Sequence, residues 1–425
     1  MKKNFCINAL LVTFLLTFTQ FVLNGCAKED LLLESTEQHN NNSGYGIASS
    51  NTNDSPEIVI NIENDIIKEY LNTQYDENNY TYTHITDYVT IEQTERKDYA
   101  EGLLLEWENI GENTSTEIIY ATTPEFDDSI IIEVEPTVSS YKLCNLIPNI
   151  NYWVKVINNH SSVVKQVSFA TIGRRRLINL SVGFNCRDLG GIKTIDNRTI
   201  KYGLYFRGGE LDGRGQIIDD YDHHVLEEVI KIKDVFDFRA AGTESKTPIK
   251  DAVYHSIPLY SMVGVYDRNN SSLDKSILNN YKACLEELLD CLAEGHPVYT
   301  HCQGGCDRSN TMSFLIMGVL GVSENDLALD YELSSFAQGA QYAYNGTGGM
   351  IRSREPFTNK YHNNYKDAIE YIKALDGYTL KDKFENFWIN ELGANIQQIN
   401  ELREYMLSEK VEDNETTGIH PVYYD

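Results

Sequence analysis

The feature that most constrains the fold is a cysteine and an arginine separated by five residues, Cys302 and Arg308. The apolar run 297–300 before this loop predicts a short buried strand, and the run 311–317 after it predicts a helix that begins near Arg308. The backbone N–H groups of residues 303–308 then have no partners within the helix and converge on the loop centre. The positive end of the helix dipole points there too, so the pattern predicts an anion site.

The two side chains that bound this loop predict its chemistry. Arg308 carries a planar, permanent charge that can hold two phosphate oxygens. The same positive field is expected to lower the pKa of the Cys302 thiol below its ordinary value of roughly 8.5. A thiolate beside a bound phosphate predicts hydrolysis of phosphate esters with sulfur as the nucleophile.

Strand-like and helix-like runs alternate between residues 174 and 409 and include an apolar strand at 235–239 and a helix at 277–294. This alternation predicts an α/β domain with a central, mostly parallel sheet flanked by helices. Ligands of such sheets bind at the carboxyl ends of the strands, where Cys302 falls.

A different pattern precedes this domain. Between residues 84 and 172 apolar residues such as Leu103 and Trp107 recur with period two, which predicts a small all-β sandwich. Tyr152 is expected to bond through its hydroxyl to the backbone at a corner between strands. The stretch resembles a fibronectin type III domain, with another small β-sandwich as the alternative. Residues 57–83 have no clear assignment.

Five segments of the α/β region resemble, in order, the bacterial tyrosine phosphatase family whose loop reads His-Cys-x-x-Gly-Lys-Asp-Arg. The segments are 185–191, 205–211, 237–239, 301–309 and 320–331. The resemblance implies the cysteine-dependent phosphatase fold. It also implies dephosphorylation of phosphotyrosine, often with phosphoserine, phosphothreonine or phosphoinositides as further substrates. No cofactor is implied, and no metal-ligand spacing is visible.

The resemblance also implies roles for individual residues. Cys302 matches the nucleophile that forms a cysteinyl-phosphate, and Arg308 matches the group that binds the phosphate and stabilises the transition state. Asp307 matches the general acid that protonates the leaving group and later accepts a proton from water. His301 is expected to orient the loop and to favour the thiolate through hydrogen bonds, and Ser309 to donate to the departing sulfur.

Two of these assignments have alternatives. Asp307 could instead cap the helix that follows it. The acid would then come from elsewhere, and Asp267 is the nearest candidate. Sulfur transfer by a rhodanese-like loop is an alternative chemistry, but the five-residue spacing and the following Ser309 favour phosphate.

The remaining loop residues are expected to bind substrate through their backbone N–H groups: Gln303, Gly304, Gly305 and Cys306. The family has lysine where this chain has Cys306, so a cation is missing and multiply phosphorylated substrates are less expected. Cys306 is near enough in sequence to form a reversible disulfide with Cys302, which would protect the nucleophile from oxidation. A small buried residue without such a role is the alternative.

The chain of 425 residues is 41% hydrophobic, enough for two or three folded domains. Its 63 acidic residues against 36 basic ones give a formal charge of −27, which argues against a nucleic-acid partner. The expected partner is a phosphorylated protein or a small phosphoester.

The first residues predict export. Lys2 and Lys3 precede an apolar run at 7–22 that ends close to Cys26, which resembles a lipoprotein signal peptide of residues 1–25. Cys26 would carry the lipid anchor. An ordinary secretory signal is the alternative.

The segments at either end of the folded part are polar. Residues 26–56 read as a flexible tether and 410–425 as a tail. The acidic start of the tether resembles a signal for the outer face of a bacterial outer membrane, with the periplasm as the other location.

These features together favour a phosphomonoester hydrolase on the exported face of a membrane, most of all a protein-tyrosine phosphatase. A second hypothesis is a catalytically weak phosphate-binding or adhesion lipoprotein, and a third is a phosphatase for phosphoinositides or inositol phosphates. Binding alone needs only Arg308 and the loop N–H groups. The presence of nucleophile, phosphate-binding arginine and candidate acid together therefore favours an enzyme.

Overall fold

The computed structural model describes residues 56–75, 83–90, 95–108, 115–158, 162–212, 217–240, 248–267, 275–337, 351–355, 361–362 and 364–410. They belong to one compact unit, Ser55–Asp425. The predicted signal peptide and Cys26, with nearly all of the tether and tail, lie outside these residues. Of the helices that the structure describes, none is both long and apolar enough to cross a membrane.

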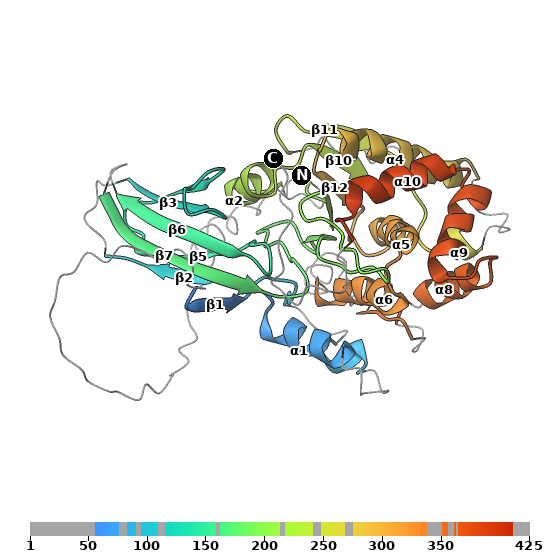
Figure 1. Ribbon diagram of the computed structural model, residues 1–425, viewed down its shortest axis with the longest axis horizontal. Helices are drawn as coiled ribbons and strands as arrows, with labels where there is room; N and C mark the ends of the chain where they lie inside the picture. The colour runs from blue at the N-terminus through green and yellow to red at the C-terminus, as the bar shows by residue number, and fades with distance from the viewer. Residues whose placement is uncertain are drawn as a thin grey trace, which may run out of the picture. The chain divides into compact units, whose positions relative to one another are not determined.

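The first part of the unit is built of strands (Figure 1). One sheet has the order β1-β7-β6-β3-β4, and β2 pairs with β5 in a second. The strands are β1 (Ile58–Asn61), β2 (Leu103–Glu106), β3 (Thr116–Ala121), β4 (Ile130–Val134), β5 (Ser140–Leu143), β6 (Asn151–Asn158) and β7 (Ser162–Ile172). Alternate residues of β2 and β6 are buried, which confirms the predicted period-two strands.

Tyr152 lies at the start of β6, in the core of this part. Its hydroxyl accepts a hydrogen bond from the backbone N–H of Ile147 at 2.9 Å, as predicted. Its ring stacks on Phe169 with 5.5 Å between the ring centroids. The narrower likeness to a fibronectin type III domain stays a prediction.

Residues 57–83, which the sequence left unassigned, begin with β1, and β1 pairs in parallel with β7. The next element is the helix α1 (Asp65–Gln74), whose first turn is capped by the Asn64 side chain. α1 packs against the C-terminal part of the chain: the Tyr70 hydroxyl donates to the Glu332 carboxylate at 2.6 Å. Tyr70 also shares a buried apolar cluster with Leu329 and Ile351.

The C-terminal part contains a five-stranded sheet of order β11-β10-β12-β9-β8. Its strands are β8 (Arg187–Asp188), β9 (Tyr205–Gly208), β10 (Asp234–Asp237), β11 (Val253–Ser256) and β12 (Val298–His301). Only the β8–β9 pair is antiparallel within it. Every residue of β9, β10 and β12 is buried, as expected of strands covered on both faces. The predicted mostly parallel sheet is confirmed.

Helices and short turns complete this part. They are α2 (Asp220–His224), η2 (Val225–Val229), α3 (Val263–Tyr266), α4 (Lys275–Ala293), α5 (Arg308–Leu320), α6 (Glu324–Leu333), η3 (Ser334–Ala337), α8 (Asn364–Lys373), α9 (Leu380–Asn386), η4 (Phe387–Glu391) and α10 (Ile396–Met406), with η1 (Ile85–Asp87) earlier in the chain. Two short strands, β13 (Ile351–Arg352) and β14 (Tyr361–His362), pair in parallel.

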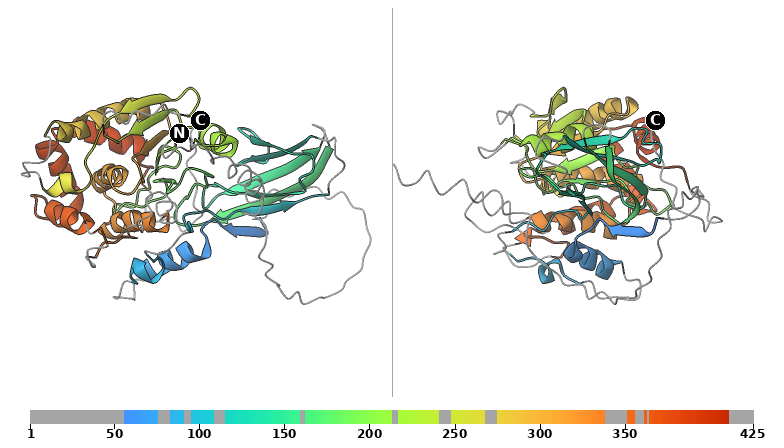
Figure 2. Two further views of the ribbon diagram at one scale, coloured as in Figure 1. Left: turned by 180° about the vertical axis from the view of Figure 1, so that it is seen from behind. Right: turned by 90° about the vertical axis from the view of Figure 1, so that its left-hand side faces the viewer.

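The helix α5 lies at the centre of the C-terminal part, in contact with α6, α9 and α10 (Figures 1 and 2). It is buried from Ser309 to Leu320, and from Phe314 to Leu320 its sequence is without polar side chains, as expected of a helix covered on all sides. Gly318 lets α9 approach closely, since a Cβ there would lie 2.5 Å from the Phe384 ring. The helix ends at Gly321, whose φ of +93° is a conformation that glycine adopts without strain. The C-terminal half of α5 is therefore packed closely against α9.

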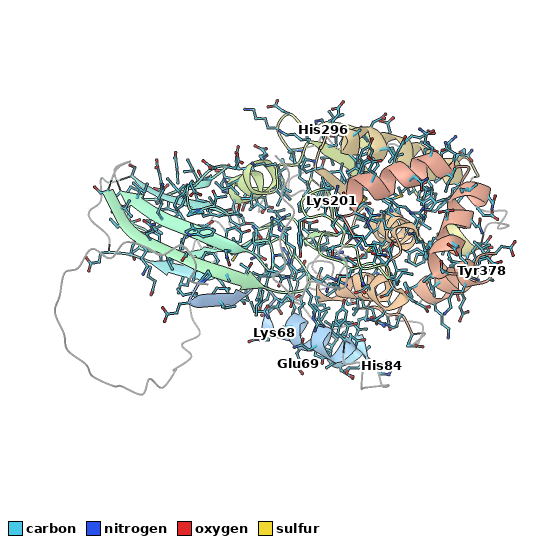
Figure 3. The ribbon with its side chains drawn as sticks, in the orientation of Figure 1. Lys68, Glu69, His84, Lys201, His296 and Tyr378 are labelled. Carbon is cyan, nitrogen blue, oxygen red and sulfur yellow. The ribbon has the colours of Figure 1, made fainter. Side chains whose placement is uncertain are left out.

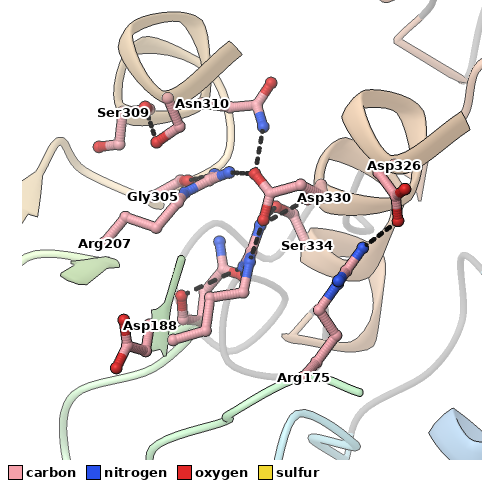
Figure 4. Close-up of polar contacts among 12 residues, drawn as sticks. Arg175, Asp188, Arg207, Gly305, Ser309, Asn310, Asp326, Asp330 and Ser334 are labelled. Carbon is pink, nitrogen blue, oxygen red and sulfur yellow. Dashed lines mark hydrogen bonds and ion pairs between the residues drawn. The ribbon is translucent and has the colours of Figure 1, made fainter. Parts of the chain in front are cut away.

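A buried ionic cluster joins the sheet to these helices (Figure 4). The Asp330 carboxylate on α6 lies 2.7 Å from the Arg187 guanidinium and also pairs with Arg207. The Asn310 side-chain amide donates to the same carboxylate at 3.2 Å. Burial alone would raise the pKa of Asp330, but the two arginines lower it to about 2. The cluster thus stays ionised and links β8, β9, α5 and α6.

Asp330→Asn is expected to lower the free energy of unfolding by about 3–5 kcal/mol, because two buried guanidinium groups lose their counter-charge. Urea unfolding measures this loss. Glu324→Gln is the matched control: Glu324 pairs with Lys373 at 2.9 Å on the surface, with side chains 45% and 50% exposed. Its loss is expected to cost at most about 1 kcal/mol.

The same contribution depends on pH. The folded-state pKa of Asp330, about 2, lies below the roughly 3.9 of an unfolded aspartate, so the stabilisation is present at neutral pH. It is lost as the pH falls from about 4 through about 2. Equal urea midpoints for Asp330→Asn and Glu324→Gln at pH 7 would contradict this account.

Candidate active site

The phosphate loop, residues 302–308, joins the end of β12 to the start of α5, as the sequence predicts. β12 lies between β9 and β10, so the loop sits at the carboxyl ends of three parallel strands. The Cys302 side chain is buried at its base. Arg308 donates to the carbonyl of Phe238, just beyond β10, at 3.3 Å. The nucleophile and the phosphate-binding arginine therefore share one site.

Two side chains outside the loop hold its carbonyl groups. The Asn185 amide donates to the carbonyl of Gly304 at 3.0 Å, and the Arg207 guanidinium donates to the carbonyl of Gly305. In a trans peptide the C=O and the following N–H point in opposite directions. Carbonyls that are held on the outer side of the loop therefore direct the next two N–H groups inward. This orientation is what an anion requires.

Gly305 is required by this geometry for two reasons. Its φ of +67° lies in the left-handed region. A Cβ at this position would also lie 2.4 Å from the carbonyl of Gly208 at the end of β9. The loop thus packs directly on the neighbouring strand. Gln303 and Gly304 are partly exposed, as expected for residues that line the substrate side.

The pKa of the Cys302 thiol is lowered from its ordinary value. Burial acts to raise it, but the charge of Arg308 and hydrogen bonds from the side chain and backbone of Ser309 outweigh burial. The Ser309 hydroxyl is fully buried and has no other hydrogen-bond partner within the described part of the chain. The site therefore favours a thiolate, with the buried Ser309 hydroxyl beside it.

His301 acts on the backbone and not on the sulfur. Its Nδ1 atom lies 3.3 Å from the carbonyl oxygen of Cys302 and 4.0 Å from the Asp237 carboxylate. Burial lowers the pKa of His301 in spite of Asp237, so the ring is neutral at pH 7. The expected role in orienting the loop fits this geometry. The hydrogen bond reaches the Cys302 carbonyl, and the positive field at the sulfur comes from Arg308.

Asp307 immediately precedes α5, but its side chain makes no capping hydrogen bond. Its carboxylate instead forms two hydrogen bonds with the guanidinium of Arg352, at 2.7 and 3.2 Å. Asp307 thus occupies the N-cap position of α5 without capping the helix through its side chain. The Asp307 side chain is 32% exposed, which leaves it accessible to a substrate. Asp267, the other candidate acid, follows α3, which packs against α8.

Arg352 is the partner of Asp307, a pairing that the sequence analysis does not predict. It lies on β13, is buried, and is 45 residues away from Asp307 in the chain. Its charge also acts on the Cys306 thiol. A cation is thus present beside the loop position where the family has lysine, although it comes from a distant strand. No local motif marks such a partner.

Cys306 forms part of the loop wall. Its thiol donates to the Gly304 carbonyl at 3.0 Å and accepts from the Asn185 amide at 3.4 Å. Burial raises the pKa of Cys306 despite Arg352, so it is a neutral thiol. Cys302 and Cys306 are both unbridged. The protective disulfide stays a prediction.

Comparison with known proteins agrees with this geometry. Residues 178–408, more than half of the chain, match a sequence model of the tyrosine phosphatase family. No curated protein matches the sequence.

Solved structures with a similar chain include a cysteine-to-serine variant of P. aeruginosa TpbA in complex with pTyr, at 12% identity and a TM-score of 0.28. The match covers 50% of this chain and 96% of that one. Another is the core catalytic domain of the PP-IP phosphatase SIW14 from S. cerevisiae, at 13% identity and a TM-score of 0.25. Here the match covers 39% of this chain and 86% of that one. Likenesses this distant do not define the family of the chain, whereas the match over residues 178–408 does. The chain belongs to the tyrosine phosphatase family.

Proposed function

We propose that the protein hydrolyses phosphate monoesters, chiefly phosphotyrosine in proteins, through a cysteinyl-phosphate intermediate. The arrangement that supports this most is the buried Cys302 at the base of a loop whose Gly304 and Gly305 carbonyls are held from outside by Asn185 and Arg207, and the charge of Arg308 lowers the pKa of that thiol. Asp307, within that loop, supplies the acid that binding alone would not need.

In the first step the Cys302 sulfur attacks phosphorus and the P–O bond to the leaving group breaks. The bonding electrons pass to the phenolate oxygen, which takes a proton from Asp307. Arg308 and the loop N–H groups bind the phosphoryl oxygens as their charge is redistributed. In the second step water attacks phosphorus, Asp307 takes a proton from it, and the S–P bond breaks. The Ser309 hydroxyl donates to the sulfur as the thiolate forms again.

The charge of Arg352 has a different effect on each of the two steps. Its charge favours the carboxylate form of Asp307, which is the form that takes the proton from water. The first step needs the protonated form, and a bound phosphate dianion favours it by repulsion. We assign Arg352 as the residue that positions Asp307 and balances its charge between these forms.

A phosphoinositide or inositol phosphate is the second candidate substrate. Cys306 replaces the lysine that would bind additional phosphates, which disfavours it. The buried charge of Arg352 near Cys306 favours it. Because Asp307 already neutralises Arg352, we place phosphotyrosine first.

Steady-state hydrolysis of a phosphotyrosine peptide, a phosphoserine peptide and a phosphoinositide tests the proposal. The phosphotyrosine peptide is expected to have the highest kcat/KM, and Cys302→Ser is expected to reduce all rates to background. Asp307→Asn is expected to lower kcat about 10²–10⁴-fold for poor leaving groups. Asp267→Asn is the matched control and is expected to retain activity. Equal rates for wild type and Cys302→Ser would contradict the proposal that the protein is an enzyme that uses Cys302. Loss of activity in Asp267→Asn alone would contradict only the assignment of Asp307 as the general acid.

Arg352→Gln tests the charge balance at Asp307. Removal of the cation disfavours the carboxylate, so the limb of the pH–kcat profile that reports Asp307 is expected to move to higher pH. Arg352→Lys keeps a charge and is expected to retain most of the wild-type position. A purely structural role would lower stability in both variants and leave the limb where it is.

We also propose that the protein is exported and held to a membrane through Cys26, with residues 26–56 as a tether and the β-sandwich as a spacer. The cationic start, the apolar run and Cys26 support this. Expression of the full chain in a Gram-negative host with labelled palmitate is expected to label wild type and not Cys26→Ser. The label should follow the outer-membrane fraction. Equal labelling of both proteins would contradict the anchor.

A further inference from the structure

A cluster of nitrogen, sulfur and oxygen donors lies away from the phosphate loop. Asp234 begins β10, whereas the loop follows the opposite end of the neighbouring strand β12. One donor atom each of Asp234, His255 and Cys291 lies within 4.8 Å of the other two. The mechanism uses none of them. We propose that this cluster binds a zinc ion, with His296 as the fourth ligand.

The contacts in the cluster centre on Asp234. One of its carboxylate oxygens lies 2.8 Å from His255 Nε2, and the other lies 2.9 Å from His296 Nδ1. The Asp234 side chain is buried. Cys291, in the last turn of α4, is also buried. Asp234 therefore contacts both histidines, and its carboxylate, His255 and Cys291 bring their donor atoms together.

The end of α4 places His296 there. Gly295 has a φ of +71°, and the backbone N–H of His296 donates to the carbonyl of Cys291 at 3.0 Å. This tight turn holds His296 against the last helical turn and directs it toward Asp234. Figure 3 labels His296 in the orientation in which Figure 1 labels β11, the strand next to β10.

The second nitrogen of each histidine faces a carboxylate. His255 Nδ1 lies 3.5 Å from Glu287, and His296 Nε2 lies 3.4 Å from Glu294. Histidines that bind metals usually donate their other N–H to a carboxylate, which fixes the tautomer and makes the ligand more basic. Both histidines of this cluster thus have an exposed carboxylate within ion-pair distance of the nitrogen that does not face Asp234.

The donor set selects the ion. Two imidazoles, a thiolate and one carboxylate suit zinc in tetrahedral coordination, whereas calcium and magnesium prefer oxygen alone. Binding forms the sulfur–zinc bond and releases the Cys291 proton to solvent. Four protein ligands leave no open position, so the ion is structural and ties the end of α4 to β10 and β11.

Cobalt(II) titration of the metal-stripped full chain in a Cys302→Ser background tests the site, since cobalt reports thiolate ligands by charge-transfer absorption. That background removes the active-site thiolate as a competing ligand. One equivalent of cobalt is expected to produce the thiolate band and a tetrahedral spectrum, and zinc is expected to displace it. Cys291→Ser is expected to lose the band. Cys284→Ser, also buried and on the same helix, is the matched control and is expected to retain it.

A thermal-shift measurement covers the case in which Cys291→Ser folds poorly. Stoichiometric zinc is expected to raise the melting temperature of the Cys302→Ser chain and of Cys284→Ser, but not of His255→Gln. Absence of the thiolate band, its survival in Cys291→Ser, or an equal zinc shift in His255→Gln would overturn the site. The cluster would then be a hydrogen-bond network that holds α4 to the sheet. None of these readouts depends on phosphatase activity.

Discussion

The hydrogen bonds that hold the carbonyls of Gly304 and Gly305 outward are the contacts on which the active site depends. They come from Asn185 and Arg207, and Arg207 is in turn held by Asp330. A peptide that rotated would place a carbonyl oxygen where the phosphate must lie and would repel it. The anion site is therefore maintained by a buried ionic cluster behind the loop.

Charge at this site is supplied by parts of the chain that are far apart. Arg308 and the dipole of α5 belong to the loop and the helix that follows it. Arg352 lies on β13 and pairs with Asp307. Its charge acts on Cys306, so a cation lies near this loop position although the residue there is not a lysine. The thiol at 306 instead completes the loop wall by bonding to the Gly304 carbonyl.

Features that depend on neighbouring residues could be predicted from the sequence. The strand and helix around Cys302 and Arg308 follow from short apolar runs, and the alternate burial of β6 follows from its period. Contacts between distant residues could not, because tertiary packing selects them. The Arg352 partner of Asp307 lies 45 residues away, and no periodic pattern encodes it. The same holds for the parallel pairing of β1 and for the docking of α1.

The helix α1 comes early in the sequence but packs against the C-terminal part of the fold. The segment that matches the family starts at residue 178, yet α1, more than a hundred residues earlier, buries Tyr70 against α6 and shares a cluster with Ile351, next to Arg352. The Glu63 carboxylate, just before α1, accepts hydrogen bonds from the backbone of Arg174 and Arg175, just after the sandwich. In the sequence, α1 therefore lies between two strands of the sandwich, β1 and β2, although it packs against the C-terminal part. A recombinant fragment cut at the family boundary would leave a bare apolar face behind the strand that carries Arg352.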